Sequence, residues 1–247
     1  MEDLNEEERV LLAEIEGRIT EPPKPTNNLY NVFHRLVGND LCVIFGDSGS
    51  GKTRTCFQLA TDSISRGKKV LYIDTEGNLS GDMIDTLKSS GVEYRRTTDH
   101  ITTAEVVDRA RGFDVLIVDS ATLFITGKWY DLDRGKRGGL LQHLQGMYHS
   151  AKIKCEKEKM MAIMVAQPRS DYGDNKSIEP MGDKAQFMTK VIIRVICTRS
   201  VDGKPMKRSL VIFRSRNIED GTHFSYFTTT LTGICLTEWD NIRRVVG

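Results

Sequence analysis

The clearest chemistry in the chain comes from one short segment, whose residues are Gly46, Asp47, Ser48, Gly49, Ser50, Gly51, Lys52 and Thr53. This spacing is that of a phosphate-binding loop (P-loop), in which glycines let backbone N–H groups turn toward phosphate oxygens. In such a loop Lys52 reaches the β- and γ-phosphates of a nucleoside triphosphate, and the Thr53 hydroxyl ligates Mg²⁺. The sequence therefore predicts a nucleotide and Mg²⁺ site formed by this segment and the next residue, Arg54.

The residues on either side of the loop suit this interpretation. Leu41 to Phe45 is a short apolar run, which predicts a buried strand that leads into the loop. From Thr53 to Ser65, apolar or small residues fall on one helical face, which predicts a helix. Strand, loop and helix are the setting that a phosphate loop requires. The alternative is a surface turn rich in glycine and serine.

A second apolar run, residues 113–119, ends in a carboxylate, Asp119. If this run is a buried strand beside the first one, Asp119 lies near the Mg²⁺ ion and holds its water shell. Many buried strands end in aspartate, and the alternative role is that of an N-cap for the turn that follows. The preceding phosphate loop favours the metal role.

Two further polar residues follow predicted strands. Glu76 lies in the sequence Asp-Thr-Glu-Gly just after residues 70–74, and a glutamate there can orient or deprotonate the attacking water. Gln167 directly follows residues 160–166, where an amide can sense the γ-phosphate. The alternatives are a solvated loop acid for Glu76 and a capping residue for Gln167.

Arg214 and Arg216 are two residues apart near the end of a predicted strand, residues 208–215. Strand side chains repeat every two residues, so both arginines share one face and can form a phosphate clamp. The phosphate could belong to ATP on a neighbouring subunit or to DNA, or the two side chains could simply be solvated.

Two loops are candidate contacts for single-stranded nucleic acid. In residues 127–139, cations alternate with aromatic rings that can stack on bases; they are Lys128, Trp129, Tyr130, Arg134, Lys136 and Arg137. In residues 168–184, Arg169, Lys176 and Lys184 are offset by four acidic residues, so the second loop has the weaker case. The alternative is that both are mobile surface loops.

Composition limits the remaining possibilities. The chain has 247 residues and a formal net charge of +1, so DNA contacts must come from local basic patches. Its five cysteines are scattered and form no C-x-x-C pair, which favours reduced thiols over disulfides or zinc. The acidic N-terminus is no signal peptide, and the longest apolar run is too short to span a bilayer. We expect a cytoplasmic protein with no membrane contact.

The order of elements predicts the fold class. Residues 1–28 are expected to form a short helix (4–19) and a proline-rich linker, and residues 29–247 one α/β domain. Strands and helices alternate from Leu41, and residues 138–159 predict a long helix. Three β-rich runs then follow, residues 190–198, 208–215 and 223–230. This order predicts a mostly parallel sheet extended by a C-terminal antiparallel meander.

Taken in order, GDSGSGKT, YIDTEG at 72–77, LIVDSAT at 116–122, MVAQ at 164–167 and VIFRSR at 211–216 resemble the motifs of the RecA/RadA recombinase family. The resemblance covers about residues 30–236 and is greatest to the archaeal RadB-like paralogues, which are bare ATPase cores. It implies a RecA-like core that binds ATP and Mg²⁺, with Glu76 as catalytic glutamate and Gln167 as γ-phosphate sensor. It also implies that residues 127–139 and 168–184 are the two DNA-binding loops, and that Arg214 and Arg216 act on a neighbour's nucleotide.

The sequence departs from the full recombinases in four ways. It shows no helix-hairpin-helix domain and no Phe-x-x-Ala polymerisation hook in the linker; residues 57–60 have the hook's spacing but belong to the P-loop helix. The turn after Glu76 lacks the family's arginine, and the second loop lacks a dense glycine run. These departures argue against filaments and strong strand exchange.

The function that combines these observations is a slow ATPase that acts as an accessory or mediator in DNA recombination and repair. It is expected to bind single-stranded DNA, and either a recombinase partner or a second copy through its ATP face. The alternative is a KaiC-like assembly or signalling module that ATP controls and that has no DNA role. Salt-sensitive binding to single-stranded DNA distinguishes the two.

Overall fold

The computed structural model describes residues 28–124, 134–169, 179–180, 187–198, 207–215, 223–228 and 234–236. The predicted helix at 4–19 and nearly all of the predicted linker lie outside these residues. The proposed division of the chain at residue 28 therefore stays a prediction. Among the described residues, no helix is both long and apolar enough to cross a bilayer.

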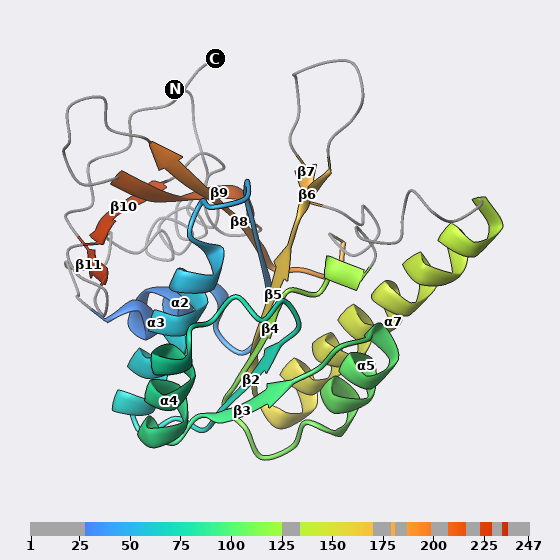
Figure 1. Cartoon of the computed structure of the whole chain (residues 1–247), viewed down its shortest axis with the longest axis horizontal. Coiled ribbons are helices and arrows are strands. Elements are labelled where there is room, and N and C mark those ends of the chain that lie inside the picture. Colours follow the sequence, from blue (N-terminus) through green and yellow to red (C-terminus); the bar gives the residue numbers. More distant parts are fainter. Residues whose placement is uncertain are drawn as a thin grey trace, which may run out of the picture.

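The described strands form one nine-stranded sheet and a two-stranded ribbon, β6 with β7 (Figure 1). The order in the large sheet is β11-β10-β9-β8-β1-β5-β4-β2-β3. Its strands are β1 (Leu41–Phe45), β2 (Val70–Asp74), β3 (Glu93–Arg96), β4 (Val115–Asp119), β5 (Met161–Ala166), β8 (Val191–Thr198), β9 (Lys207–Ser215), β10 (His223–Thr228) and β11 (Ile234–Leu236). The ribbon pairs β6 (Pro168–Arg169) with β7 (Glu179–Pro180).

The pairing directions confirm the predicted fold class. Strands β8, β1, β5, β4, β2 and β3 pair in parallel. Strands β8 to β11 continue the sheet as an antiparallel meander. The sheet is therefore a mostly parallel α/β sheet with an antiparallel extension, as the order of sequence elements indicates.

Helices cover both faces of the sheet (Figure 1). They are α2 (Leu29–Val37), α3 (Lys52–Ser65), α4 (Gly81–Ser90), α5 (His100–Arg109) and α7 (Arg134–Glu158). Successive strand side chains point to opposite faces, so Cys42 and Ile44 pack in the core layer of α2, α3 and α4, while Val43 packs in that of α5 and α7. Because both faces are covered, β1, β2, β4 and β5 are buried along their whole length, which explains their unbroken apolar sequences.

The long helix differs from its prediction at its start. Helix α7 begins at Arg134, four residues before the predicted Gly138, so the predicted loop 127–139 is helical from Arg134 onward. The pair Gly138-Gly139 lies inside the helix. Apolar side chains further along α7, Leu140 and Leu144 among them, pack into the sheet core, and this tertiary packing outweighs the low helix propensity of glycine.

Candidate nucleotide site

Four parallel strands end beside one another at one edge of the sheet, in the order β1-β5-β4-β2. The phosphate loop follows β1, Gln167 follows β5, Asp119 ends β4, and Glu76 follows β2. Ligands of open α/β sheets bind at this carboxyl edge of the strands. The structure thus brings the predicted phosphate loop and three predicted polar residues to one edge.

The phosphate loop has the backbone conformations that its glycines allow. Gly46, Gly49 and Gly51 have φ angles of 154°, 77° and 106°, a range that residues with side chains rarely adopt. At Gly46 there is also no space, because a Cβ atom would lie 2.3 Å from the carbonyl oxygen of Val195 in β8. The first glycine of the loop is therefore fixed by both its backbone angle and its neighbour.

Lys52 is the first residue of α3 and is buried, with 7% of its surface exposed. Its Nζ donates hydrogen bonds to the carbonyl oxygens of Gly46 at 2.7 Å and Asp47 at 3.0 Å. Burial lowers the pKa of Lys52, and the carboxylates of Glu76 and Asp119 oppose this shift. The loop thus holds a cation beside its own backbone, close to two acidic groups.

Asp119 supplies a buried carboxylate with one oxygen unsatisfied. Its Oδ2 accepts a hydrogen bond of 2.9 Å from the Tyr72 hydroxyl, whereas Oδ1 is buried and has no hydrogen-bond partner among the described residues. Burial, and secondly the charge of Glu76, raise the pKa of Asp119 to about 6, and the Thr53 hydroxyl opposes this shift. A buried carboxylate oxygen beside a threonine hydroxyl suits a hydrated Mg²⁺ ion, so Thr53 and Asp119 fit the metal that the motif implies.

We predict that Asp119→Asn stabilises the protein in the presence of a chelator at pH 7.5. The folded pKa of Asp119 lies above its ordinary value of 3.8, so the folded state binds more protons between about pH 4 and 6 and loses stability as the pH rises through this range. Asparagine removes the buried charge and can still accept from Tyr72, so the gain approaches about 3 kcal/mol above pH 6.5. Below pH 4 the gain should vanish.

Urea unfolding with EDTA at pH 7.5 and pH 3.8 measures this change. Asp114→Asn is the matched control, because Asp114 directly precedes β4 but is 41% exposed and pairs with Lys68 at 3.5 Å. The control should gain no stability at either pH. A destabilised Asp119→Asn protein at pH 7.5 would contradict the raised pKa of Asp119 in the folded state.

Glu76 and Gln167 are in direct contact although they are 91 residues apart. Gln167 Nε2 donates to Glu76 Oε1 at 2.9 Å, and Asn78 donates to Glu76 Oε2 at 2.5 Å. The backbone N–H of Gln167 donates to the Thr122 hydroxyl at 2.7 Å, which fixes the start of its segment. The structure therefore brings together the two residues predicted to activate water and to sense the γ-phosphate; their roles stay predictions.

Two residues beside Glu76 were not singled out by the sequence. Thr75 joins the ends of β2 and β4. Its backbone N–H donates to Asp119 O at 2.8 Å. Its hydroxyl donates to Ser120 O at 2.8 Å and accepts from Ser120 N at 2.7 Å. Asp74 is buried and accepts hydrogen bonds from groups on β3 and from the turn after Glu76. The only sequence signal for either was its position at a strand end.

The structure describes the remaining predicted site residues only in part. Arg214 lies in β9 with an exposed side chain, and Arg216 lies outside the described residues. Arg134, Lys136 and Arg137 are in the first turn of α7 and Arg169 is in β6, with their side chains outside the description. Lys128, Trp129, Tyr130 and Lys176 also lie outside it.

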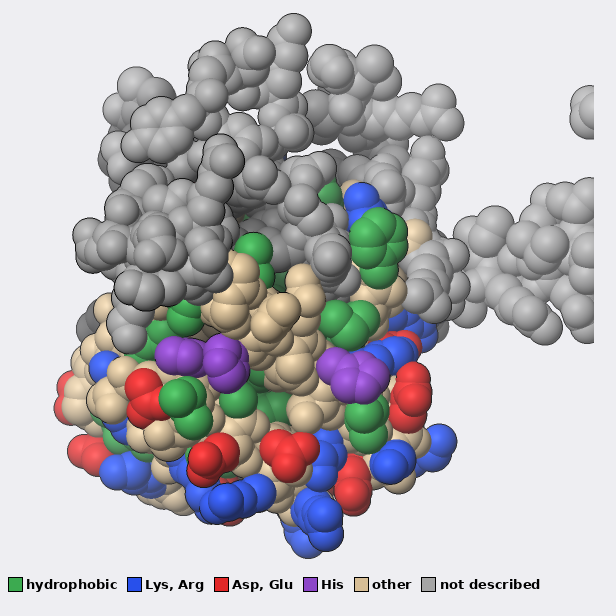
Figure 2. Space-filling model, turned by 90° about the vertical axis from the view of Figure 1, so that its right-hand side faces the viewer, with side chains coloured by type: hydrophobic (Ala, Val, Ile, Leu, Met, Phe, Trp, Pro, Cys, Tyr) green, Lys and Arg blue, Asp and Glu red, His purple; other side chains and the backbone are tan. Residues whose placement is uncertain are grey.

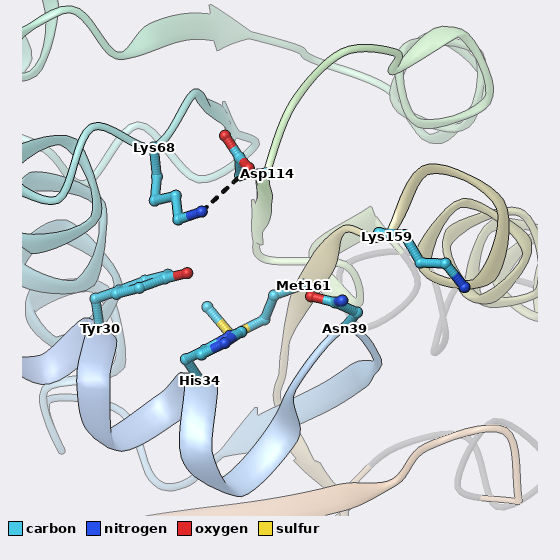
Figure 3. A pocket seen from close by; sticks show the side chains of 7 residues that line it. All are labelled: Tyr30, His34, Asn39, Lys68, Asp114, Lys159 and Met161. Atoms are coloured by element: carbon cyan, nitrogen blue, oxygen red, sulfur yellow. Dashed lines mark hydrogen bonds and ion pairs between the residues drawn. The ribbon is translucent and has the colours of Figure 1, made fainter.

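A cavity lies near the amino ends of the strands, at the opposite edge of the sheet from the nucleotide site (Figure 3). It has a volume of about 280 Å³ and is lined by Tyr30, His34, Asn39, Lys68, Asp114, Lys159 and Met161. Apart from Tyr30 and His34 on α2, its lining residues lie just before strands begin, or at the start of β5, whereas the phosphate loop follows the end of a strand. Lys68 in this cavity is paired with Asp114 at 3.5 Å.

The sheet order, the phosphate loop after β1 and the antiparallel extension define a RecA-like P-loop nucleoside triphosphatase core. A family model described as an AAA domain matches residues 39–152. The crystal structure of a RadB recombinase has the same fold, with a TM-score of 0.63 and 20% identity, over 82% of this chain and 93% of that one.

Curated relatives narrow this class further. The chain is 31% identical over 212 residues to the DNA repair and recombination protein RadB of Methanococcoides burtonii, covering 77% of this chain and 86% of the relative. It is 25% identical over 206 residues to the RadB of Methanothermobacter thermautotrophicus, covering 74% and 82%. The chain belongs to the RadB family.

Proposed function

We propose that the chain binds Mg·ATP at residues 46–54, hydrolyses it slowly, and acts as an accessory or mediator in DNA recombination and repair. The observation that supports this most is the convergence of Lys52, Asp119, Glu76 and Gln167 at the carboxyl edge of four parallel strands. The names of its relatives, which are DNA repair and recombination proteins, support the biological role.

Each residue at the edge has a specific task in hydrolysis. Lys52 exchanges its hydrogen bonds with loop carbonyls for contacts with phosphate oxygens and stabilises the charge that develops on them. Thr53 and Asp119 would hold Mg²⁺, which would neutralise charge on the phosphates when it is bound. Glu76 orients the attacking water and accepts its proton, and Gln167 reports the state of the γ-phosphate to the segment that follows it.

The contact between Gln167 and Glu76 makes the reporting role specific. Gln167 Nε2 occupies one carboxylate oxygen of Glu76. An amide that turns to a γ-phosphate must release that oxygen, so sensing and activation of water are coupled through one hydrogen bond. Residues 168 and 169 follow Gln167 directly and begin the β6–β7 ribbon within the predicted second DNA loop, so this loop is the segment that Gln167 would report to.

DNA binding is proposed for the predicted first loop, residues 127–139, more than for the second. The side seen in Figure 2 is no general anion-binding face, because basic and acidic side chains of the described residues are interspersed there. A net charge of +1 leads to the same conclusion. Binding must therefore come from local cations and rings, which this loop supplies.

We predict weak, salt-dependent binding to single-stranded DNA. With three or four phosphate contacts, the slope of log K against log salt should be about −2 to −3, from roughly −0.7 for each contact. The triple substitution Arg134→Ala, Lys136→Ala and Arg137→Ala should flatten this slope. Trp129→Ala should weaken binding by about 1–3 kcal/mol with little change in slope, because stacking releases no counterions. Fluorescence anisotropy with a labelled oligonucleotide, with and without Mg·ATP, measures both quantities.

The matched control removes three cations elsewhere. The three control residues have exposed side chains outside residues 127–139. Arg109 is the last residue of α5, Arg111 lies two residues further on, and Lys157 is near the C-terminal end of α7. Their replacement by alanine changes the net charge equally and should leave the slope unchanged. A protein that binds Mg·ATP but shows no DNA binding at low salt would reject the DNA role and favour the signalling alternative.

A further inference from the structure

The turn that carries Glu76 is attached to the edge strand β3 through one buried carboxylate, that of Asp74. The Asp74 side chain is 3% exposed and accepts three hydrogen bonds: from the Gly77 N–H at 2.7 Å, the Tyr94 hydroxyl at 2.8 Å and Arg96 Nη1 at 2.9 Å. Burial, and then the hydrogen bond to Asp74, raise the pKa of Tyr94 to about 12, so its hydroxyl stays a donor at neutral pH.

Arg96 also touches the turn directly. A Cβ atom on Gly77 would lie 2.5 Å from both terminal nitrogens of Arg96 and 2.6 Å from its Cζ, so the guanidinium lies against the bare Cα of Gly77. Gly77 has a φ angle of 70°, which also favours glycine. The Arg96 side chain as a whole is 41% exposed, so this contact lies at the surface of the protein.

The backbone holds β3 in the register that these contacts need. Asp74 is the register partner of Arg96 in the parallel pair of β2 and β3, and the N–H of Thr97 donates to Asp74 O at 3.0 Å. Arg96 is thus the last residue of β3 beside the last residue of β2. Through Arg96, strand β3 therefore reaches Gly77, the residue next to Glu76.

Both neighbours of Glu76 in the chain are therefore fixed. On one side Thr75 is bonded to Asp119 and Ser120 at the end of β4. On the other side Gly77 is bonded to Asp74 and covered by Arg96. Glu76 is the single residue between these two anchors, so the direction of its carboxylate depends on both.

We propose that Arg96, assisted by Tyr94, is a positioning residue that fixes the turn of Glu76 for the hydrolysis of ATP. The inference rests on the proposed role of Glu76 as the residue that activates water. A carboxylate that must meet a water in line with the γ-phosphate tolerates little displacement, because small misplacements of a catalytic group reduce rates strongly. Loss of Arg96 should therefore lower kcat and leave the binding of ATP nearly unchanged.

The test compares Arg96→Ala, Arg96→Lys, Tyr94→Phe and Gly77→Ala with a matched control, Arg95→Ala. Arg95 is the preceding residue of β3, is exposed and pairs with Glu93. For Arg96→Ala, kcat should fall about 10- to 100-fold, the effect of losing one charged hydrogen bond, while KM stays within about threefold. Gly77→Ala, which displaces the guanidinium, should lower kcat to a similar extent. Arg96→Lys and Tyr94→Phe should lower kcat less, and Arg95→Ala should leave kcat unchanged.

Hydrogen exchange gives a second measurement that needs no ATP hydrolysis. The amide of Gly77, which donates to Asp74, should exchange faster in Arg96→Ala by about tenfold or more, while the amide of Thr55, which donates to Gly51 O in the first turn of α3, should keep its rate. A purely stabilising role would instead lower the melting temperature, raise exchange throughout the domain and leave kcat of the folded enzyme unchanged.

The two ideas fail in different ways. A wild-type protein that binds ATP but never hydrolyses it would reject the proposed function, and the exchange rate of Gly77 would still decide whether Arg96 fixes the turn. A hydrolysing protein in which Arg96→Ala changes neither kcat nor the exchange of Gly77 would overturn the inference.

Discussion

Lys52→Ala is expected to abolish ATP turnover, with a loss of at least about 10³-fold, because no other cation of the loop opposes the charge on the γ-phosphate. The described geometry supports this size of effect. Lys52 is buried against the loop and already lies within hydrogen-bonding distance of the carbonyls of Gly46 and Asp47. The backbone cradle left in the variant can still contact phosphates, but it carries no net charge.

ATPase assays on the purified protein measure this loss, with circular dichroism as the check on folding. Lys68→Ala is the matched control, since Lys68 precedes β2 at the opposite edge and pairs with Asp114. The control should hydrolyse ATP at the wild-type rate. Undiminished activity of a folded Lys52→Ala protein would reject the nucleotide site.

Glu76→Gln is expected to keep the affinity for ATP and to slow hydrolysis by roughly 10²-fold or more, because it removes only the activation of water. The amide has the same shape as the carboxylate, and its oxygen can still accept from Gln167 Nε2. The phosphate loop, Thr53 and Asp119 are untouched. Binding of a fluorescent ATP analogue, followed by single-turnover hydrolysis, separates affinity from chemistry.

Glu93→Gln is the control for Glu76→Gln. Glu93 begins β3 and is exposed, so the same change of charge there should alter neither quantity. If Glu76→Gln instead loses affinity while the bound ATP turns over at the normal rate, Glu76 has a structural role and the proposed mechanism is wrong.

The central strands could be predicted because burial on both faces leaves a continuous apolar sequence. Strands β1, β2, β4 and β5 are of this kind, and the sequence predicts each of them to within two residues. Strand β3 reads Glu-Tyr-Arg-Arg and is mostly exposed, so neither periodicity nor apolar content identified it. Helices α4 and α5 begin directly after the capping residues Ser80 and Asp99, which are local signals in the sequence for a helix start.

The site was predictable where chemistry follows a strand end. Asp119, Glu76 and Gln167 lie beside the phosphate loop as this rule predicts, because the topology carries every parallel strand end to one edge. Lys52 belongs to the loop motif itself, and the roles of all four residues stay predictions. Contacts between side chains were not predictable. The bond from Arg96 to Asp74 joins residues 22 positions apart and depends on the register of β3, which no local pattern in the sequence specifies.

Strand β3 has a consequence for assembly as well. It is the last strand on its side of the described sheet, and such an edge exposes unpaired N–H and C=O groups to which another chain can add a strand. Here the edge is four residues long, and three of its four side chains are charged: Glu93, Arg95 and Arg96. Short, charged edges disfavour strand addition. The strand that holds the turn of Glu76 therefore also disfavours growth of the sheet on this side, so we expect no strand addition by a second copy at β3.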